Sequence, residues 1–154
     1  MAKAVILDAS TGLDEAGLAT LEKKLGLTLP ADYRSFLSQR NGGRPVPECF
    51  SFLDDDGPYS DSLVDWFLSV GTDDPSDLLE YYSMYVEEER VPSHMLPIAH
   101  DPFGNLILLS LSGDDAGAIY FWDHENEGDA DYSNLNYIGK NLDHFLERLF
   151  SFQG

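Results

Sequence analysis

Two apolar runs near the middle of the chain constrain the fold more than any other feature of the sequence. They span residues 105–110 and 118–123, within a longer stretch at 96–123. Between them, residues 112–117 read Ser-Gly-Asp-Asp-Ala-Gly, a composition typical of turns. Short runs rich in Ile, Leu, Tyr, Phe and Trp that are bounded by such residues are typical of strands. The pattern therefore predicts a β-hairpin at the centre of a sheet.

Apolar residues that recur at spacings of three and four predict helices near both ends of the chain and directly before the central stretch. Capping residues are expected to set where these helices begin and end, because they satisfy backbone groups that a helix leaves unpaired. The first helix is expected to begin at Ser10, Thr11 or Asp14 and to end at Gly26. The second should begin near Pro30 and end in a left-handed cap at Asn41-Gly42-Gly43. Ser76 is expected to cap the start of the third helix, and Asn141 the start of the last.

Further apolar segments predict additional strands. Residues 49–53 are expected to form one strand, and residues 54–58, which read Asp-Asp-Asp-Gly-Pro, have the composition of a solvated turn. Residues 4–7 are expected to form either a short edge strand or a disordered lead-in, and a short strand is expected at residues 137–138. A last strand is expected at residues 63–70. Because side chains of a strand alternate between its two faces, one set should point toward the core and Asp65 toward solvent. The core-facing set is Val64, Trp66, Leu68 and Val70.

Together these elements predict one α+β domain over residues 1–154. A chain of this length is large enough to bury a hydrophobic core, and its hydrophobic content of 43% favours folding over disorder. Strands interspersed with helices indicate a layered arrangement. We expect a central, largely antiparallel sheet, with helices at both ends of the chain packed mainly on one face.

The charge of the chain restricts its partners. It has 28 Asp and Glu residues against 9 Lys and Arg residues, for a formal net charge of −19. Nucleic acids and anionic membranes are polyanions, so we expect neither to bind. A basic protein is the expected partner, and the alternative is an acidic protein whose charge serves solubility alone.

The sequence also predicts where the protein is located. Residues 1–8 hold an apolar run too short for a secretory signal peptide. No apolar stretch approaches the roughly 18 residues that a membrane-spanning helix needs. Cys49 is the single cysteine, so an internal disulfide is excluded, and its apolar surroundings favour a buried position. We expect a cytoplasmic protein.

Motifs for catalysis or cofactor binding are missing from the sequence. It has no Gly-x-Ser-x-Gly nucleophile elbow, no phosphate-binding glycine loop and no dinucleotide fingerprint. The acidic run that starts at Asp54 fails the calcium-loop pattern, because Tyr59 stands where glycine is required. We therefore expect no enzyme activity, no cofactor and no metal. The alternative is a small metal-dependent hydrolase that uses His100, Asp101, Asp123 and His124, which flank the hairpin.

Several short motifs, taken in order, resemble those of a known family. They are Leu21-Glu22 through Leu29-Pro30 with Tyr33, Phe36-Leu37 and Asn41-Gly42-Gly43; Pro97-Ile98-Ala99 with Asp101 and Gly104-Asn105; Phe121-Trp122-Asp123-His124-Glu125; and Leu142, Phe145-Leu146 and Leu149. This order resembles the SUKH superfamily of Smi/Knr-type domains, whose fold is also α+β. Many bacterial members are immunity proteins for toxins that are often nucleases. The resemblance implies a non-enzymatic protein that neutralises a toxin by protein–protein interaction. The family's eukaryotic members imply the alternative, a regulatory scaffold.

We expect acidic loops and two aromatic residues to contact the partner. Acidic loops would occupy the groove in which a basic nuclease holds phosphates, and large aromatics ringed by charge are typical of binding hot spots. For the two tryptophans, a position in the core is the competing interpretation. The expected contact residues are Asp54, Asp55, Asp56, Asp61, Asp114, Asp115, Asp123 and Glu125, with Phe103 and Trp122 as anchors.

Overall fold

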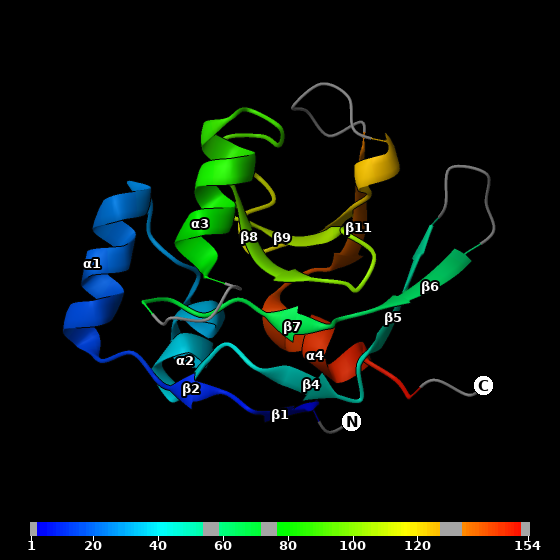
Figure 1. Cartoon of the computed structure of the whole chain (residues 1–154), viewed down its shortest axis with the longest axis horizontal. Helices are drawn as coiled ribbons and strands as arrows, with labels where there is room; N and C mark the ends of the chain where they lie inside the picture. Colours follow the sequence, from blue (N-terminus) through cyan, green and yellow to red (C-terminus); the bar gives the residue numbers. More distant parts are fainter. Residues whose placement is uncertain (1–2, 54–58, 72–76, 127–133, 152–154) are drawn as a thin grey trace.

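An antiparallel sheet forms the centre of the protein in the computed structural model, which describes residues 3–53, 59–71, 77–126 and 134–151 (Figure 1). Within these residues the sheet has five strands in the order β11-β10-β9-β8-β7. The strands are β7 (Trp66–Phe67), β8 (Met95–His100), β9 (Leu106–Ser110), β10 (Ile119–Trp122) and β11 (Leu135–Gly139). β9 and β10 are the central hairpin, so this prediction is confirmed.

Three pairs of short strands surround this sheet in the described part of the chain. The first pair is β1 (Val5–Leu7) with β4 (Arg44–Val46), and the second is β2 (Ser10–Thr11) with β3 (Arg40–Asn41). The third pair is a longer antiparallel hairpin that projects at the right of Figure 1. Its strands are β5 (Cys49–Leu53) and β6 (Tyr59–Leu63).

The helices begin close to the positions that the sequence predicts. They are α1 (Glu15–Leu25), α2 (Ala31–Gln39), α3 (Leu78–Tyr82) with its π-helical continuation η1 (Ser83–Glu87), the 3₁₀ turn η2 (His124–Asn126) and α4 (Leu142–Arg148). Asp14 caps α1 by accepting a hydrogen bond from the Gly17 amide, and Asn141 caps α4 by accepting one from the His144 amide. Asp77 caps α3, while the predicted cap Ser76 lies outside the described residues.

Both faces of the central sheet are covered. On one face, Leu96, Ile98, Ile107, Leu109, Ile119 and Phe121 join a hydrophobic cluster that contains the buried residues of α1, α2 and α4. On the other face, Met95, Leu106, Leu108 and Trp122 pack with Val86 of η1 and with Val91. Three helices thus share one face, as the sequence predicts, while η1 closes the other and Leu78 of α3 reaches the first cluster.

Two local predictions are wrong. Residues 63–70 do not form one strand, because the chain leaves the β5–β6 hairpin at Leu63 and joins the central sheet as β7. Phe67 is fully buried in consequence, and Trp66 is half-buried. The left-handed cap of α2 is also absent: Arg40 is extended, with φ −146°, because Arg40 and Asn41 pair with β2 instead.

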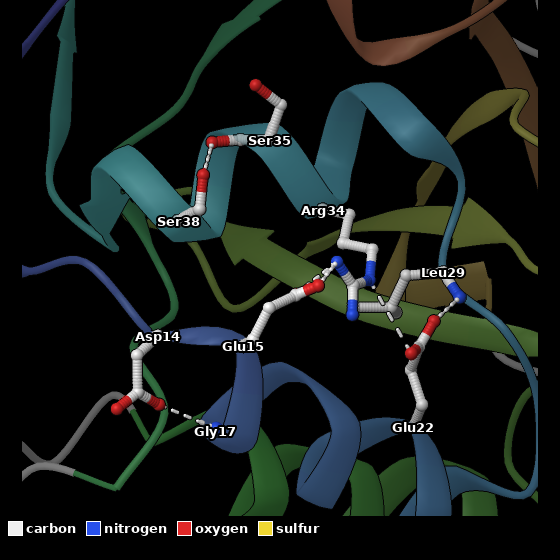
Figure 2. Close-up of polar contacts among 8 residues, drawn as sticks. All are labelled: Asp14, Glu15, Gly17, Glu22, Leu29, Arg34, Ser35 and Ser38. Carbon is white, nitrogen blue, oxygen red and sulfur yellow. Dashed lines mark hydrogen bonds and ion pairs between the residues drawn. The ribbon is translucent and has the colours of Figure 1, made fainter.

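Charged groups join α1 to α2 (Figure 2). The guanidinium Nη1 of Arg34 lies 2.9 and 2.7 Å from the two carboxylate oxygens of Glu15. Arg34 Nε lies 3.5 Å from Glu22, whose carboxylate also accepts a hydrogen bond from the Leu29 amide at 2.8 Å. These contacts fix the bend between the two helices, which in turn places the apolar side of α2 against the sheet.

Replacing Tyr33 by phenylalanine is expected to raise the free energy of unfolding by about 1 kcal/mol. Tyr33 is fully buried, and its hydroxyl has no hydrogen-bond partner among the described residues. Burial also raises the pKa of Tyr33, so the hydroxyl stays protonated. Tyr33→Phe removes a desolvated polar group while it keeps the ring that stacks near Phe36. Urea denaturation of the two proteins measures the change, and a clear loss of stability in Tyr33→Phe would contradict it.

Candidate functional site

The loop between β8 and β9 is organised by a buried carboxylate. Asp101 is 3% exposed. Its Oδ1 accepts hydrogen bonds from the amides of Phe103 and Asn105, both at 2.9 Å. Its Oδ2 accepts from Asn105 Nδ2 at 2.8 Å and from Ser62 Oγ of β6 at 3.0 Å. Four donors therefore compensate the buried charge, and the loop is held against the β5–β6 hairpin.

Asn105 extends this network to the segment that follows β10. Its Oδ1 accepts hydrogen bonds from the His124 amide at 3.0 Å and from His124 Nδ1 at 2.7 Å. Because an amide oxygen only accepts, Nδ1 of His124 carries a proton. Gly104 has φ +91°, and a Cβ there would lie 3.4 Å from the His124 ring. The positive φ explains why glycine stands here, while a side chain at this position would meet the ring only at ordinary contact distance.

The network leaves Phe103 at the surface. Its side chain is 65% exposed, although both ends of its loop are bonded to buried groups. Beside it lies a depression of about 280 Å³. The depression is lined by Asp61, Asp123 and Glu125, by His124, and by Phe52 and Phe121 beneath. No Lys or Arg is among the described residues that line it, so its charge is negative at neutral pH.

Four of the expected contact residues meet at this depression: Asp61, Phe103, Asp123 and Glu125. Asp61 comes from β6, and Asp123 and Glu125 follow β10. The Asp123 carboxylate accepts a hydrogen bond from the Glu125 amide at 2.9 Å, which begins η2. Asp54, Asp55 and Asp56 lie outside the described residues. The structure therefore gathers expected residues from three separate segments into one surface.

The acids of the β9–β10 turn do not join this surface. The turn follows Ser110, at the opposite end of β9 from the loop that bears Phe103. Asp114 is exposed there. Asp115 instead supports the turn, since its carboxylate accepts hydrogen bonds from Ser110 Oγ at 2.8 Å and from the Tyr120 hydroxyl at 2.7 Å.

The expectation that Trp122 is a surface anchor is wrong. Its side chain is 2% exposed and packs on the sheet face that η1 covers. Alternation along β10 explains this position, because Phe121 and Trp122 must point to opposite faces, and both faces are buried. The competing interpretation of Trp122 as a core residue is confirmed.

The geometry does not assemble the alternative metal site. His100 and His124 line two different depressions on either side of the 101–105 loop. The carboxylate of Asp101 is already bonded to four donors. In the part of the chain that the structure describes, no group of three or more His, Cys, Asp or Glu residues has an arrangement that could hold a metal ion.

Cys49 is not placed for nucleophilic chemistry. It is buried, and burial raises the pKa of its thiol, so the unreactive protonated form is favoured at neutral pH. Among the described helices, none combines the length and the apolar character that a membrane crossing requires.

Sequence reasoning missed the residues that position this site. The sequence motifs include Asp101 and Asn105, but no pattern in the sequence indicates their contacts with Ser62 and His124. An aspartate directly before Pro-Phe-Gly and shortly before an apolar strand is a signal for a carboxylate that caps a turn. The partners from β6 and from the end of β10 are distant in sequence, and no local pattern indicates them.

Comparisons with known proteins agree with the resemblance noted in the sequence. The sequence matches the SMI1 / KNR4 family (SUKH-1) over residues 12–148. It is 32% identical over 124 residues to the SPbeta prophage-derived uncharacterized protein YokK of Bacillus subtilis (strain 168). That alignment covers 70% of this chain and 60% of the relative, so the chain spans less than two thirds of the length of the protein it matches.

Proposed function

Because this chain belongs to the SMI1 / KNR4 family (SUKH-1), we propose that it is an immunity protein that binds and neutralises a basic toxin domain. The observation that carries the proposal is the surface around Phe103. An exposed aromatic side chain stands on a loop with a buried hydrogen-bond network, beside the carboxylates of Asp61, Asp123 and Glu125, and none of the described residues that line the depression is Lys or Arg. Its partner is a positively charged protein with an apolar pocket.

Electrostatics support fast capture of such a partner. A formal charge of −19 attracts a basic domain over distances longer than direct contacts reach. At the surface itself, Asp61, Asp123 and Glu125 provide acceptors for Lys and Arg side chains. The same residue types bind nucleic-acid phosphates in nucleases, so the carboxylates would occupy a toxin's substrate site. Binding would block the toxin without any catalytic step by this protein, in the cytoplasm where the toxin acts.

Preorganisation supports tight binding. A flexible loop loses conformational entropy when a partner fixes it, and this loss weakens association. Here Asp101 and Asn105 already fix the loop on both sides of Phe103. The aromatic ring therefore reaches a partner's pocket with little further ordering, as hot-spot residues typically do.

The test is a binding and inhibition assay with a basic toxin domain captured from lysate of the source cell at low salt. Wild type is compared with the variant Asp61→Asn, Asp123→Asn, Glu125→Gln, which removes three charges at the depression. The control, Glu87→Gln, Glu88→Gln, Asp114→Asn, removes three charges from exposed residues elsewhere. We expect the first variant to bind at least about 10-fold more weakly and to associate more slowly, while the control changes much less.

Results of two kinds would overturn the proposal. Equal losses in the two variants would mean that the depression is not the contact surface. A partner that binds with its own activity unchanged would indicate a scaffold rather than an immunity protein. Repeating the assay at high salt adds a check, because binding that depends on charge weakens as ions screen it.

Truncation of the exposed ring gives a separate prediction. Phe103→Ala is expected to weaken binding of the same toxin about 30-fold. This factor corresponds to a loss of about 2 kcal/mol in binding free energy, which is typical of a hot-spot residue. Its stability should match that of wild type, because the Phe103 side chain is mostly in solvent. Isothermal titration calorimetry and thermal unfolding measure the two properties. An affinity within about twofold of wild type would contradict the role of Phe103 as an anchor.

A further inference from the structure

A row of aromatic rings lies beside the 101–105 loop, on the side opposite the acidic depression. The ring centroids of Tyr85 and Tyr81 are 5.9 Å apart, with 23° between the ring planes. Tyr81 in turn stacks with His100 at 5.9 Å and 10°. Tyr81 belongs to α3, Tyr85 to the π-helical turn η1, and His100 ends β8. The row thus crosses from the helical segment to the end of the central sheet, where Figure 1 places α3 beside β8.

One end of this row already holds a guanidinium group from the chain itself. The Cζ atom of Arg90 lies 4.4 Å from the ring centroid of Tyr85 and 5.8 Å from that of Trp122. These distances are in the range in which a cation is attracted to the face of an aromatic ring. Within the chain itself, therefore, one ring of this row, Tyr85, already pairs with an arginine.

The rings of this row also line a second depression, of about 240 Å³. Tyr81, Tyr85 and His100 line it together with Asp65, Pro102 and Gly104. The Asp65 side chain is 48% exposed, and its Oδ2 lies 3.7 Å from His100 Nδ1. His100 Nδ1 donates to the Asp101 carbonyl at 3.1 Å, which holds the ring in place. No Lys or Arg is among the described residues that line this depression.

We propose that this second depression binds an arginine side chain of the protein's basic partner. A planar guanidinium stacks on aromatic rings and pairs with a carboxylate through two hydrogen bonds, whereas the ammonium of lysine does neither as well. Asp65 supplies the carboxylate and the Tyr81–His100 stack supplies the rings. The choice of a protein partner rests on the proposed function; the location and the arginine chemistry rest on the contacts above.

The two depressions imply one arrangement of the partner's surface. Pro102 and Gly104 line the second depression and Phe103 lines the first, so the tip of the loop separates them. A partner would present an apolar pocket for Phe103, basic groups on the side of Asp61, and one arginine on the side of Asp65. The arginine would fix the orientation in which the partner docks, since two separated charge contacts define a direction across the surface.

The test uses a small probe and the full chain. N-acetyl-arginine methylamide is titrated into ¹⁵N-labelled protein, and amide shifts are followed at Asp65, Tyr81 and His100. The citrulline derivative serves as the matched ligand control, because it has nearly the same shape and no charge. We expect saturable shifts at these residues with arginine, and affinity at least about 10-fold lower with citrulline.

Matched variants distinguish binding of arginine at this depression from a general attraction of a cation to an acidic protein. Asp65→Asn and Asp114→Asn remove the same charge, one at the depression and one at the distant turn. We expect Asp65→Asn to weaken arginine binding about 10-fold and Asp114→Asn to leave it within about twofold. Tyr81→Leu keeps the net charge and should also weaken binding. Unperturbed amide spectra elsewhere confirm that each variant folds.

Three results would overturn the inference: no saturable shift at these residues, equal binding of citrulline, or equal effects of the two aspartate substitutions. None of them involves the toxin, so each would leave the proposed function standing. Conversely, failure of the toxin assay with arginine binding intact would remove the proposed function and leave an arginine site without a known source of arginine.

Discussion

Replacing Asp101 by alanine is expected to lower the free energy of unfolding by about 3 kcal/mol or more, a large part of the roughly 5–15 kcal/mol that a domain has. The carboxylate accepts hydrogen bonds from Ser62, Phe103 and Asn105 in a site that is 3% exposed. Alanine removes every acceptor at once and leaves those donors without partners. Urea denaturation of wild type and Asp101→Ala measures the loss.

Two comparisons make this prediction specific. Asp101→Asn keeps one oxygen that can accept from the loop amides but turns an NH₂ group toward the other donors. The free energy of unfolding should therefore fall less than in Asp101→Ala but clearly below that of wild type. Asp114→Ala removes an exposed acid of the same type, and its effect should stay within about 0.5 kcal/mol. If Asp101→Ala were as mild as Asp114→Ala, the network would contribute little to stability.

Under the proposed function, the same substitution should also weaken toxin binding, although Asp101 itself is buried. Without the network, the amides of Phe103 and Asn105 lose the bonds that hold the loop. Amide hydrogen exchange at these positions is expected to accelerate, and complexes should dissociate faster because the partner must then order the loop. The proposed binding surface thus depends on a residue that is buried beneath it.

Local patterns in the sequence were sufficient to predict most of the fold. Two continuous apolar runs on either side of a Gly- and Asp-rich turn specify the β9–β10 hairpin without any information about distant contacts. Asp14 and Asn141 are placed correctly as caps, because capping is a local interaction. The strand predicted at residues 63–70 failed for the opposite reason. The segment pairs with two different strands: residues up to Leu63 pair with β5, and residues from Trp66 pair with β8.

The candidate site was predictable in residue type but not in arrangement. Sequence reasoning identified Asp61, Phe103, Asp123 and Glu125 from their charge or their aromatic character. It gave the same weight to Asp115, which is instead bonded within its own turn. Only the topology places β6, the 101–105 loop and the end of β10 together. The order of strands in a sheet depends on contacts between distant segments, which periodicity does not encode.

Trp122→Ala is expected to lower the free energy of unfolding by about 3–5 kcal/mol, because it leaves a large cavity in a packed cluster. Trp122 packs with Val86, Leu106 and Leu108, and its ring meets Tyr85 edge-on at 5.4 Å. The surrounding groups come from a helical turn and from paired strands, so they cannot collapse to fill the space. Trp122→Phe keeps an aromatic ring, so its free energy of unfolding should fall by roughly half as much as that of Trp122→Ala. Thermal and urea unfolding measure both.

A comparison of Trp122→Ala with Phe103→Ala separates core aromatics from surface aromatics in this protein. Trp122→Ala should lower the stability. At a temperature where this variant remains folded, its affinity for the proposed toxin should be near that of wild type. The second should lose affinity and keep stability, since Phe103 is 65% exposed and Trp122 is 2% exposed. If Trp122→Ala unfolded like wild type and lost toxin affinity instead, Trp122 would be a contact residue, and the sheet face beneath η1 would have to open for the partner to bind.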